Sequence, residues 1–587
     1  MAQPLRIGGA SGFWGEAPHA TAQLQGAGVD VLVYDYLAEI TMSIMARARR
    51  KDSGLGYATD FVTDAMTPNL QSIAEAGVKV LSNAGGVNPM ACAEALRARI
   101  AEAGLSLQVA VVDGDDLLDR ANEFSGMSEM FSGAPMPSVE KIASINAYLG
   151  AGPIVAALSA GADIVITGRC VDSALTLAAC MHHHGWTHAD HDLLAAGSLT
   201  GHLLECGPQS TGGNFTDWEE AGDLALIGYP IAEVSGDGTM VLTKPEGTTG
   251  VVSPASVTEQ MLYEIGDPRA YVLPDVVCDF LDVEIVQEGP DRVRVSGARG
   301  HAPTGKLKVS ATWVDGYRAG MVFQMNGRDA RTKAKVFAQA GLDRARQTLG
   351  RMGAEDFREV SFEAFGGRQG NGAYEEIAFK AAVRHEDPRA VGVFLKALIG
   401  GALATPPGLH FFTGGGRPKP SPVVALFSFL VDASAPQISV TLNEADVAYD
   451  PPVPPVREVI PEPAREPPVG EYAGEVVERP LEDLAWARSG DKGDSANIGV
   501  IARRGAYLPY VWAALTPDAI AGVFADELNG EVRRFYLPGS DSMNIVMTRV
   551  LGGGGIASLR NDAQGKAFAQ KLLSLPVKIP VGLIVNS

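Results

Sequence analysis

The sequence has few of the features that mark disulfide-rich, secreted or membrane-spanning proteins. Its 587 residues include only five cysteines, which are odd in number and widely spaced: Cys92, Cys170, Cys180, Cys206 and Cys278. This spacing indicates neither a disulfide framework nor a CxxC zinc motif. No run of about 20 uncharged apolar residues is present to cross a bilayer, and the first residues lack the basic flank and apolar core of a signal peptide. We therefore expect a cytoplasmic protein that does not bind membranes.

Positive charge is also scarce. Lys and Arg total 48 against 69 Asp and Glu, which gives a net charge of −21, and no basic stripe is present. Because nucleic-acid-binding proteins concentrate Lys and Arg on one face, we exclude a nucleic-acid partner. Hydrophobic residues make up 46% of the chain and charged residues 20%, as in folded proteins with large buried cores. At about 150 residues per domain, the length predicts three or more domains.

The order of apolar patterns predicts an α/β fold with several parts. In the first two hundred residues, continuous apolar runs alternate with amphipathic helical segments, which indicates a mainly parallel sheet covered on both faces. A stretch rich in proline then indicates an extended linker before a small two-layer α+β domain. The predicted parts are an α/β ligand-binding core (1–250), a mixed α+β region (251–449), the linker (450–475) and the carboxy-terminal domain (476–587).

Polar residues follow the predicted strands of the core. The carboxyl ends of parallel strands share one edge, where ligands bind. The candidates for substrate binding there are Ser11, Trp14, Asp35, Asn83 and Arg169. The glycines of residues 8–15 are not in the GxGxxG register, and no Walker-type lysine follows, so we predict no nucleotide cofactor.

A second dense region spans residues 201–214. His202, Glu205 and Cys206 are spaced so that all three share one helix face. We predict that His202 is a general acid or base oriented by Glu205, with Asp172 as a third catalytic residue. The turn that follows adds four candidates for substrate binding, two of them glycines suited to an oxyanion: Thr211, Gly212, Gly213 and Asn214. The alternative is a structural helix with a hydrogen-bonded histidine and an inert cysteine.

Three further segments are open to two interpretations. Among the five histidines of residues 182–191, His184, His188 and His191 have spacings seen at metal sites, but a solvated turn is favoured and no metal ligand is predicted. Glycine-rich loops at 365–372 and 412–417 each carry an arginine suited to a carboxylate, or are simple turns.

The loop predicted at residues 489–499 has both signs of charge and three glycines between two strand-like runs. Glycine permits positive φ and close approach of a ligand to the backbone. We expect it to bind substrate through five side chains: Ser489, Asp491, Lys492, Asp494 and Asn497. The alternative is a solvated turn joined by an Asp–Lys pair.

Together, these motifs resemble the acyclic terpene utilisation (AtuA-like) family over nearly the whole chain. The motifs are Gly12-Phe-Trp-Gly15, Asp35-Tyr-Leu-Ala-Glu39, Asn83-Ala-Gly-Gly86, Gly168-Arg169 with Asp172, Gly201–Gly207 with Thr211–Gly213, and Ser489–Asp494 with Asn497. The resemblance implies a carboxy-terminal ferredoxin-like domain and a place in bacterial breakdown of compounds such as citronellol and geraniol, where branched acids are carried as CoA thioesters. It supplies no established catalytic residues.

We expect an enzyme that acts on a branched carboxylated acyl-CoA or related acid by hydratase, dehydratase or carbon–carbon lyase chemistry. It would need no redox cofactor, and CoA would enter only as part of the small-molecule substrate. One alternative is a non-catalytic binding or scaffold subunit for a CoA-dependent carboxylase or hydratase. Another is a metal-dependent hydrolase or lyase with Asp and His ligands. Strand edges in the carboxy-terminal domain favour a homo-oligomer, in which residues 489–499 complete a neighbour's site.

Overall fold

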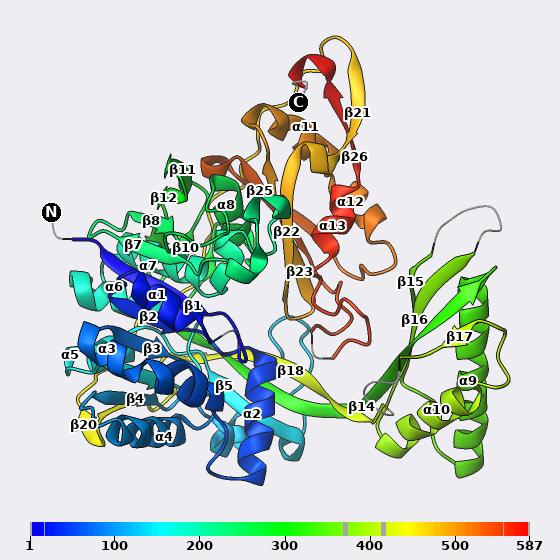
Figure 1. The fold of residues 1–587 in the computed structure, drawn as a ribbon, viewed down its shortest axis with the longest axis horizontal. Helices are drawn as coiled ribbons and strands as arrows, with labels where there is room; N and C mark the ends of the chain where they lie inside the picture. The colour runs from blue at the N-terminus through cyan, green and yellow to red at the C-terminus, as the bar shows by residue number, and fades with distance from the viewer. Residues whose placement is uncertain (1–2, 17, 368–373, 413–417, 556, 585–587) are drawn as a thin grey trace. The chain divides into compact units, whose positions relative to one another are not determined.

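The computed structural model describes residues 3–16, 18–367, 374–412, 418–555 and 557–584 (Figure 1). The chain divides into two compact units, each built from separate stretches of sequence. The first unit contains residues 1–312, 426–548 and 565–587, and the second contains 313–425 and 549–564. The arginines of the loops 365–372 and 412–417 lie outside the described residues. Among those described, no helix combines the length and apolar character that a membrane span requires.

An 11-stranded sheet forms the centre of the first unit, in the order β11-β12-β8-β7-β1-β2-β3-β6-β4-β19-β20. Its five middle strands are parallel, as predicted, and are almost wholly buried: β1 (Leu5–Ser11), β2 (Val31–Tyr34), β3 (Lys79–Ser82), β6 (Ile164–Thr167) and β4 (Val109–Asp113). Antiparallel strands extend both sides: β7 (Ile231–Val234), β8 (Met240–Thr243), β12 (Arg292–Ser296), β11 (Glu284–Gly289), β19 (Ser439–Leu442) and β20 (Ala445–Val447). The region 251–449 therefore contributes strands to this sheet.

Helices connect and cover these strands because the apolar runs of parallel strands must be buried on both faces. They are α1 (Ala20–Gly26), α2 (Glu39–Lys51), α3 (Leu70–Ala76), α4 (Pro89–Glu102), α5 (Gly152–Ser159), α6 (Ala174–His184), α7 (His191–Leu204) and α8 (Pro254–Leu262). A separate three-stranded sheet contains β9 (Tyr271–Val272), β10 (Val277–Asp279) and β13 (Arg299–His301).

Apart from residues 549–564, the carboxy-terminal domain belongs to the first unit, and it has the two layers expected. Its antiparallel sheet has the order β22-β23-β25-β24, and a two-stranded β21-β26 ribbon adjoins it. The strands are β21 (Val476–Pro480), β22 (Ala485–Lys492), β23 (Ser495–Ala502), β24 (Val532–Leu537), β25 (Ser542–Met547) and β26 (Pro576–Pro580), and the helices are α11 (Leu508–Ala514), α12 (Pro517–Val523) and α13 (Phe568–Leu573).

The structure corrects the prediction of a loop at residues 489–499. These residues form a β-hairpin, in which Lys492 pairs with Ser495 and only Gly493 and Asp494 make the turn. Its two strand glycines are needed for packing and not for a loop conformation. A Cβ at Gly490 would lie 2.5 Å from Glu264 Cγ, and one at Gly499 would lie 2.4 Å from Leu262 Cβ.

The second unit is an antiparallel sheet with two helices. Its sheet contains β15 (Glu359–Gly366), β16 (Glu375–His385), β17 (Leu409–His410) and parts of β14 (Lys306–Gly327) and β18 (Ser421–Asp432). Its helices are α9 (Ala330–Met352) and α10 (Pro388–Gly400). They pack on the sheet through a core that includes Phe323, Phe337, Phe379 and Phe394. Segment 549–564 belongs to this unit, in which Arg318 and Lys380 donate to the carbonyls of Ser558 and Leu559.

Candidate functional site

Three carboxylates meet at the edge of the large sheet. Asp35 directly follows β2, Asp172 lies after β6, and Glu205 ends α7. One oxygen atom from each lies within 4.8 Å of the other two. Asp35 is 8% exposed, whereas the Asp172 side chain is 38% exposed, so the cluster runs from the interior to solvent. The convergence expected of strand-end loops is therefore present for Asp35 and Asp172, and the end of α7 adds Glu205.

Asn83 holds Asp35 in place. The Asn83 amide donates to Asp35 Oδ1, and the Asn83 Oδ1 accepts the Tyr36 N–H at 2.7 Å. Burial, followed by the charges of Asp172 and Glu205, raises the pKa of Asp35 well above its usual value, although Arg169 and Asn83 oppose the shift. Asp35 therefore holds a proton at a higher pH than an ordinary aspartate.

Arg169 is the buried cation of the cluster. Its Nη1 is 2.7 Å from Asp172 Oδ1 and donates to the Cys170 carbonyl at 3.0 Å. The guanidinium carbon lies 4.2 Å from the centroid of the Tyr148 ring. Glu39 lies on the same side of the site, where its Oε1 accepts a hydrogen bond from the Tyr148 hydroxyl at an O···O distance of 2.6 Å. Burial raises the pKa of Glu39, but Lys308, Arg169 and the Tyr148 hydroxyl outweigh burial and lower it.

His202 and Glu205 form the pair that the helix spacing predicts. His202 Nδ1 lies 3.0 Å from Glu205 Oε1, and His202 Nε2 lies 3.2 Å from the Met261 carbonyl oxygen. Burial lowers the pKa of His202, but the charge and hydrogen bond of Glu205 outweigh burial and raise it. Burial raises the pKa of Glu205 itself. Both nitrogens of His202 are thus engaged, and Glu205 is the member of the pair that joins the carboxylate cluster.

Cys206 and the glycine turn after it have structural contacts. Burial, followed by the charge of Glu205, raises the pKa of the Cys206 thiol, which disfavours the nucleophilic thiolate. The Gly213 N–H donates to the Pro208 carbonyl at 2.8 Å, and the Thr211 hydroxyl donates to the Gly228 carbonyl at 2.6 Å. Gly212 and Asn214 have positive φ of 104° and 54°. The hydrogen-bonding groups predicted for an oxyanion are therefore partly used within the turn.

The first glycine loop packs against the end of α7. A Cβ at Gly12 would lie 2.8 Å from the Glu205 carbonyl oxygen, so glycine permits this close approach. The Ser11 hydroxyl donates to the Phe13 carbonyl at 3.0 Å, and the Trp14 side chain hydrogen-bonds to Asp60. Ser11 and Trp14 thus support the loop that backs Glu205.

The β22–β23 hairpin brings a second cation to the same site. Lys492 Nζ lies 5.5 Å from the centroid of the Tyr271 ring, and this ring lies 6.1 Å from that of His202. Lys492 is exposed at the end of β22, and Tyr271, followed by Glu264, Asp172 and Glu205, raises its pKa. Within the described part of the chain, Lys492 has no carboxylate within 4.0 Å. It is therefore a cation that faces the carboxylates without being neutralised by direct contact.

Other residues of the hairpin position it. Ser489 donates to the Gly565 carbonyl at 2.6 Å and accepts the Ala569 N–H at 2.9 Å. Asn497 accepts the Glu264 N–H at 2.9 Å and donates to Asn544 Oδ1 at 2.8 Å. Asp494 lies in the turn.

Asp491 belongs to a smaller charged group beside the hairpin. Burial, followed by the charge of Glu264, raises the pKa of Asp491 to about 7. Lys566 joins this group, 2.6 Å from Glu264 and 3.5 Å from Asp491, and also donates to the Tyr263 hydroxyl.

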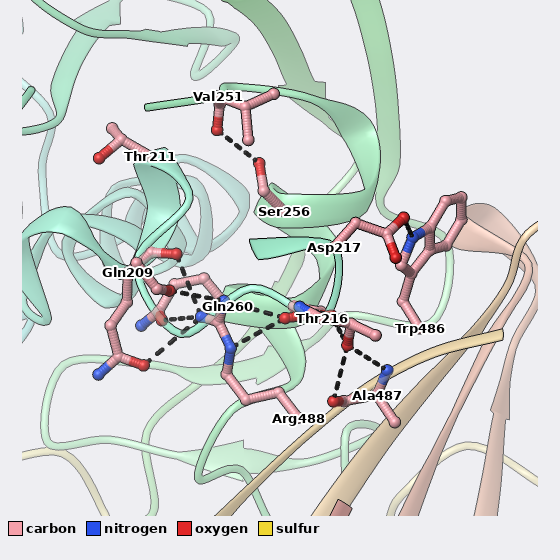
Figure 2. A network of polar contacts seen from close by, with 12 residues as sticks. Gln209, Thr211, Thr216, Asp217, Val251, Ser256, Gln260, Trp486, Ala487 and Arg488 are labelled. Atoms are coloured by element: carbon pink, nitrogen blue, oxygen red, sulfur yellow. Dashed lines mark hydrogen bonds and ion pairs between the residues drawn. The ribbon is translucent and has the colours of Figure 1, made fainter. Parts of the chain in front are cut away.

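Arg488 attaches the hairpin to the core, and sequence reasoning missed it. Figure 2 shows its side chain directed toward Gln209 and Gln260. Its Nη2 is 3.0 Å from a Glu259 oxygen, and the two side chains are 4% and 0% exposed. Nη1 donates to Gln260 Oε1, and Nη2 also donates to the Gly213 carbonyl, each at 3.1 Å. One feature of the sequence could have indicated this buried ion pair: Glu259 is the single charged residue in the otherwise uncharged helix α8.

Contacts beside Arg488 complete this attachment (Figure 2). The Thr216 hydroxyl donates to Glu259 at 2.6 Å and accepts the Ala487 N–H at 3.1 Å. Asp217 accepts the Trp486 indole N–H at 2.6 Å. Lys492 is thus placed on the core by a network of buried polar contacts.

Among the described residues, the histidines at 182–191 are not grouped closely enough to hold a metal ion, whereas the spacing of Asp35, Asp172 and Glu205 could hold one. His184 instead packs on Trp186 with its Nε2 3.1 Å from the Val234 carbonyl oxygen.

An α/β core joined to a ferredoxin-like domain, with a site of carboxylates and cations gathered from both, defines the class of this protein. A family model described as "Acyclic terpene utilisation family protein AtuA" matches residues 5–442, and one described as "AtuA ferredoxin-like domain" matches residues 479–578. The chain therefore belongs to the acyclic terpene utilisation family. No curated protein and no solved structure matches it.

Proposed function

We propose that this protein is a lyase of acyclic terpene utilisation. Its substrate in this proposal is a branched carboxylated acyl-CoA or related acid, and the reaction is addition or removal of water, or cleavage of a carbon–carbon bond. The observation that carries the proposal is the placement of Glu205. It is paired with His202, lies within 4.8 Å of Asp35 and Asp172, and is close enough to Lys492 to influence that residue's pKa.

The environment of each carboxyl group suggests its role. In dehydration, Glu205 takes a proton from the carbon beside the substrate carbonyl, and the electron pair of that C–H bond forms an enolate. The ammonium group of Lys492 stabilises the enolate oxygen. Asp35, whose raised pKa favours its protonated form, gives its proton to the leaving hydroxyl group, which departs as water. The electron pair of the enolate forms the double bond, and hydration reverses these steps.

His202 is a positioning residue in this scheme. Because its two nitrogens face Glu205 and the Met261 carbonyl, it holds Glu205 and stabilises its charge. The geometry thus favours exchanging the roles that the sequence suggests for His202 and Glu205.

A test that does not depend on the exact reaction is deuterium exchange. Purified protein would be incubated in heavy water with a panel of branched hydroxyacyl-CoA and enoyl-CoA thioesters and the free acids, with products measured by mass spectrometry. We expect deuterium at the carbon beside the carbonyl, and about 10²–10⁴-fold less with Glu205→Gln. Glu75→Gln, on the exposed face of α3, is the matched control. Binding of the panel without exchange or turnover would instead favour a scaffold subunit.

The carboxylate cluster also supports a second candidate, a metal-dependent hydrolase or lyase. Three carboxylates are the oxygen ligands that Mg²⁺ and related cations prefer. Elemental analysis of untagged protein, with activity measured before and after chelation, distinguishes the two. If the protein contains one equivalent of a divalent ion and its removal abolishes turnover, the metal-dependent reaction is favoured over the one in which Asp35 acts as a proton donor.

A further inference from the structure

A small cavity lies on the side of Arg169 formed by β5 (Ile142–Ala147), the start of α2 and β14. Its volume is about 10 Å³, and its lining includes Glu39, Ser144, Asn146, Tyr148, Arg169 and Thr312. All of its lining belongs to the first unit. A volume of about 10–15 Å³ is enough for one water-sized group.

Two residues of this lining each have a deeply buried polar atom that lacks a hydrogen-bond partner in the described part of the chain: Arg169 at Nε and Asn146 at Oδ1. Arg169 is 4% exposed and Asn146 is 3% exposed. A buried polar group without a partner costs about 1–3 kcal/mol, so the same cavity has both a donor and an acceptor to satisfy.

The orientation of Asn146 is fixed by its neighbours. Its Nδ2 donates at 2.8 Å to Asp115 Oδ2, and the same oxygen accepts the Arg169 backbone N–H at 2.9 Å. When Asp115 is ionised, this oxygen only accepts hydrogen bonds, so the NH₂ group of Asn146 faces it and Oδ1 does not. The hydroxyls of Ser144 and Thr312 are bonded to each other at 2.6 Å. The unsatisfied pair thus consists of Arg169 Nε and Asn146 Oδ1.

These requirements define the chemistry of the ligand. The group must accept a hydrogen bond from Arg169 Nε–H and donate one to Asn146 Oδ1, so an ammonium ion or a carboxylate satisfies only one of the two. The carboxylate of Glu39 also lines the cavity and disfavours an anion. We propose that this cavity binds one hydroxyl oxygen, from water or from the substrate's own hydroxyl group, between Arg169 Nε and Asn146 Oδ1.

The position matters because Arg169 also contacts the carboxylate cluster through Asp172. A hydroxyl oxygen at Nε fixes the guanidinium plane and thus the Nη1 that holds Asp172. If the oxygen belongs to the substrate, the substrate of the proposed function is a hydroxylated branched acid. That form of the inference rests on the proposed function, whereas the water form does not.

Crystal structures of the ligand-free protein at about 1.5 Å test the site directly. We expect electron density for one oxygen about 2.7–3.2 Å from both atoms if water is the source. Ser144→Val fills the cavity and should remove this density. Ser144→Ala is the matched control, because it loses the same hydroxyl bond to Thr312 but leaves the cavity open, and it should retain the density.

Calorimetric binding of a hydroxylated branched acid and its deoxy analogue identifies the source. A substrate hydroxyl predicts density only in the complex, tighter binding of the hydroxylated acid by about tenfold, and loss of that preference in Ser144→Val. Water predicts density without ligand and equal effects of Ser144→Val on both acids. Density in neither crystal, or density unchanged by Ser144→Val, would overturn the proposal even if the enzyme proves active.

Discussion

At the scale of single residues, the surroundings of Asp35 predict a pH-dependent cost to stability. The pKa of Asp35 in the folded protein lies above the unfolded value of 3.8. The favourable contribution of Asp35 to the free energy of unfolding is therefore complete below pH 3.8 and is lost as pH rises through the folded pKa. Asp35→Asn removes this loss and keeps an oxygen to accept from Asn83. We expect no gain near pH 4 and a gain of about 0.5–2 kcal/mol near pH 8, measured by urea unfolding.

The exposed residue Asp64 supplies the control for this prediction. Asp64→Asn should show no comparable rise in stability between the two pH values. If Asp35→Asn lowers the free energy of unfolding at both pH 4 and pH 8, the raised pKa assigned to Asp35 is contradicted.

Lys492 should matter for ligand binding more than for stability. Because Lys492 is exposed and no carboxylate of the described residues lies within 4.0 Å of it, Lys492→Met should leave the midpoint of thermal unfolding nearly unchanged. Loss of a charge-assisted hydrogen bond of about 1.5–3 kcal/mol should weaken binding of an anionic substrate or analogue by about 10–100-fold. Lys571→Met, at a lysine 2.9 Å from Glu527, is the control for removal of charge. If Lys492→Met and the native protein bind the anionic ligand with equal affinity in calorimetry, Lys492 does not contribute to ligand binding.

Individual residues could be predicted from sequence where local spacing decides their contacts. The His202–Glu205 pair follows from three-residue spacing on a helix, and the meeting of Asp35 with Asp172 follows from parallel strands. Arg488 could not be predicted, because its partners Glu259 and Gln260 are more than two hundred residues away and no local pattern links them. The functional roles themselves stay predictions.

At the scale of elements, the packing of β23 against α8 depends on glycine. A Cβ at Gly499 would lie 2.4 Å from Leu262 Cβ, so Gly499→Ala should destabilise the protein by about 1–3 kcal/mol. Gly522→Ala, in α12 with no atom within 4 Å of the added carbon, should instead stabilise it by about 0.5–1 kcal/mol. Urea unfolding of both variants tests the contrast, and equal midpoints would contradict it.

The elements that the sequence did not predict are stabilised by pairing with other strands of the fold. β5 was not predicted because it pairs with β14, far along the chain. Residues 489–499 have the composition of a loop, yet pairing of β23 with β22 and β25 makes them a hairpin. In the parallel strands, by contrast, the apolar run is itself the reason for burial, and their positions could be predicted.

At the scale of the molecule, the attachment of the ferredoxin-like domain to the α/β core depends on the Arg488–Glu259 pair. Arg488→Leu leaves Glu259 buried without its cation and should cost about 3–5 kcal/mol, whereas the double variant with Glu259→Leu should cost less. After limited proteolysis within the linker 450–475, the native fragments should coelute on size exclusion, and those of Arg488→Leu should separate at a lower urea concentration. Exposed Arg479→Leu is the control, and equal separation would contradict the prediction.

Association between chains is not needed to bring Lys492 to the carboxylates, since the hairpin reaches them within one chain. The idea that residues 489–499 complete a neighbour's site thus has no support from this geometry, and a homo-oligomer stays a prediction from strand edges.

The discontinuous make-up of the two units has a consequence for synthesis on the ribosome. Each unit includes a segment that follows residue 548, so neither can be completed while that part of the chain is still untranslated. At roughly 5–20 residues per second, Lys492 emerges roughly 15–60 s after Glu205. In a nascent chain, Glu205 therefore leaves the ribosome well before Lys492. During that interval, the edges of the sheets are not yet paired with the strands that are synthesised last. We therefore expect newly made chains to need chaperones and to become active only after late translation.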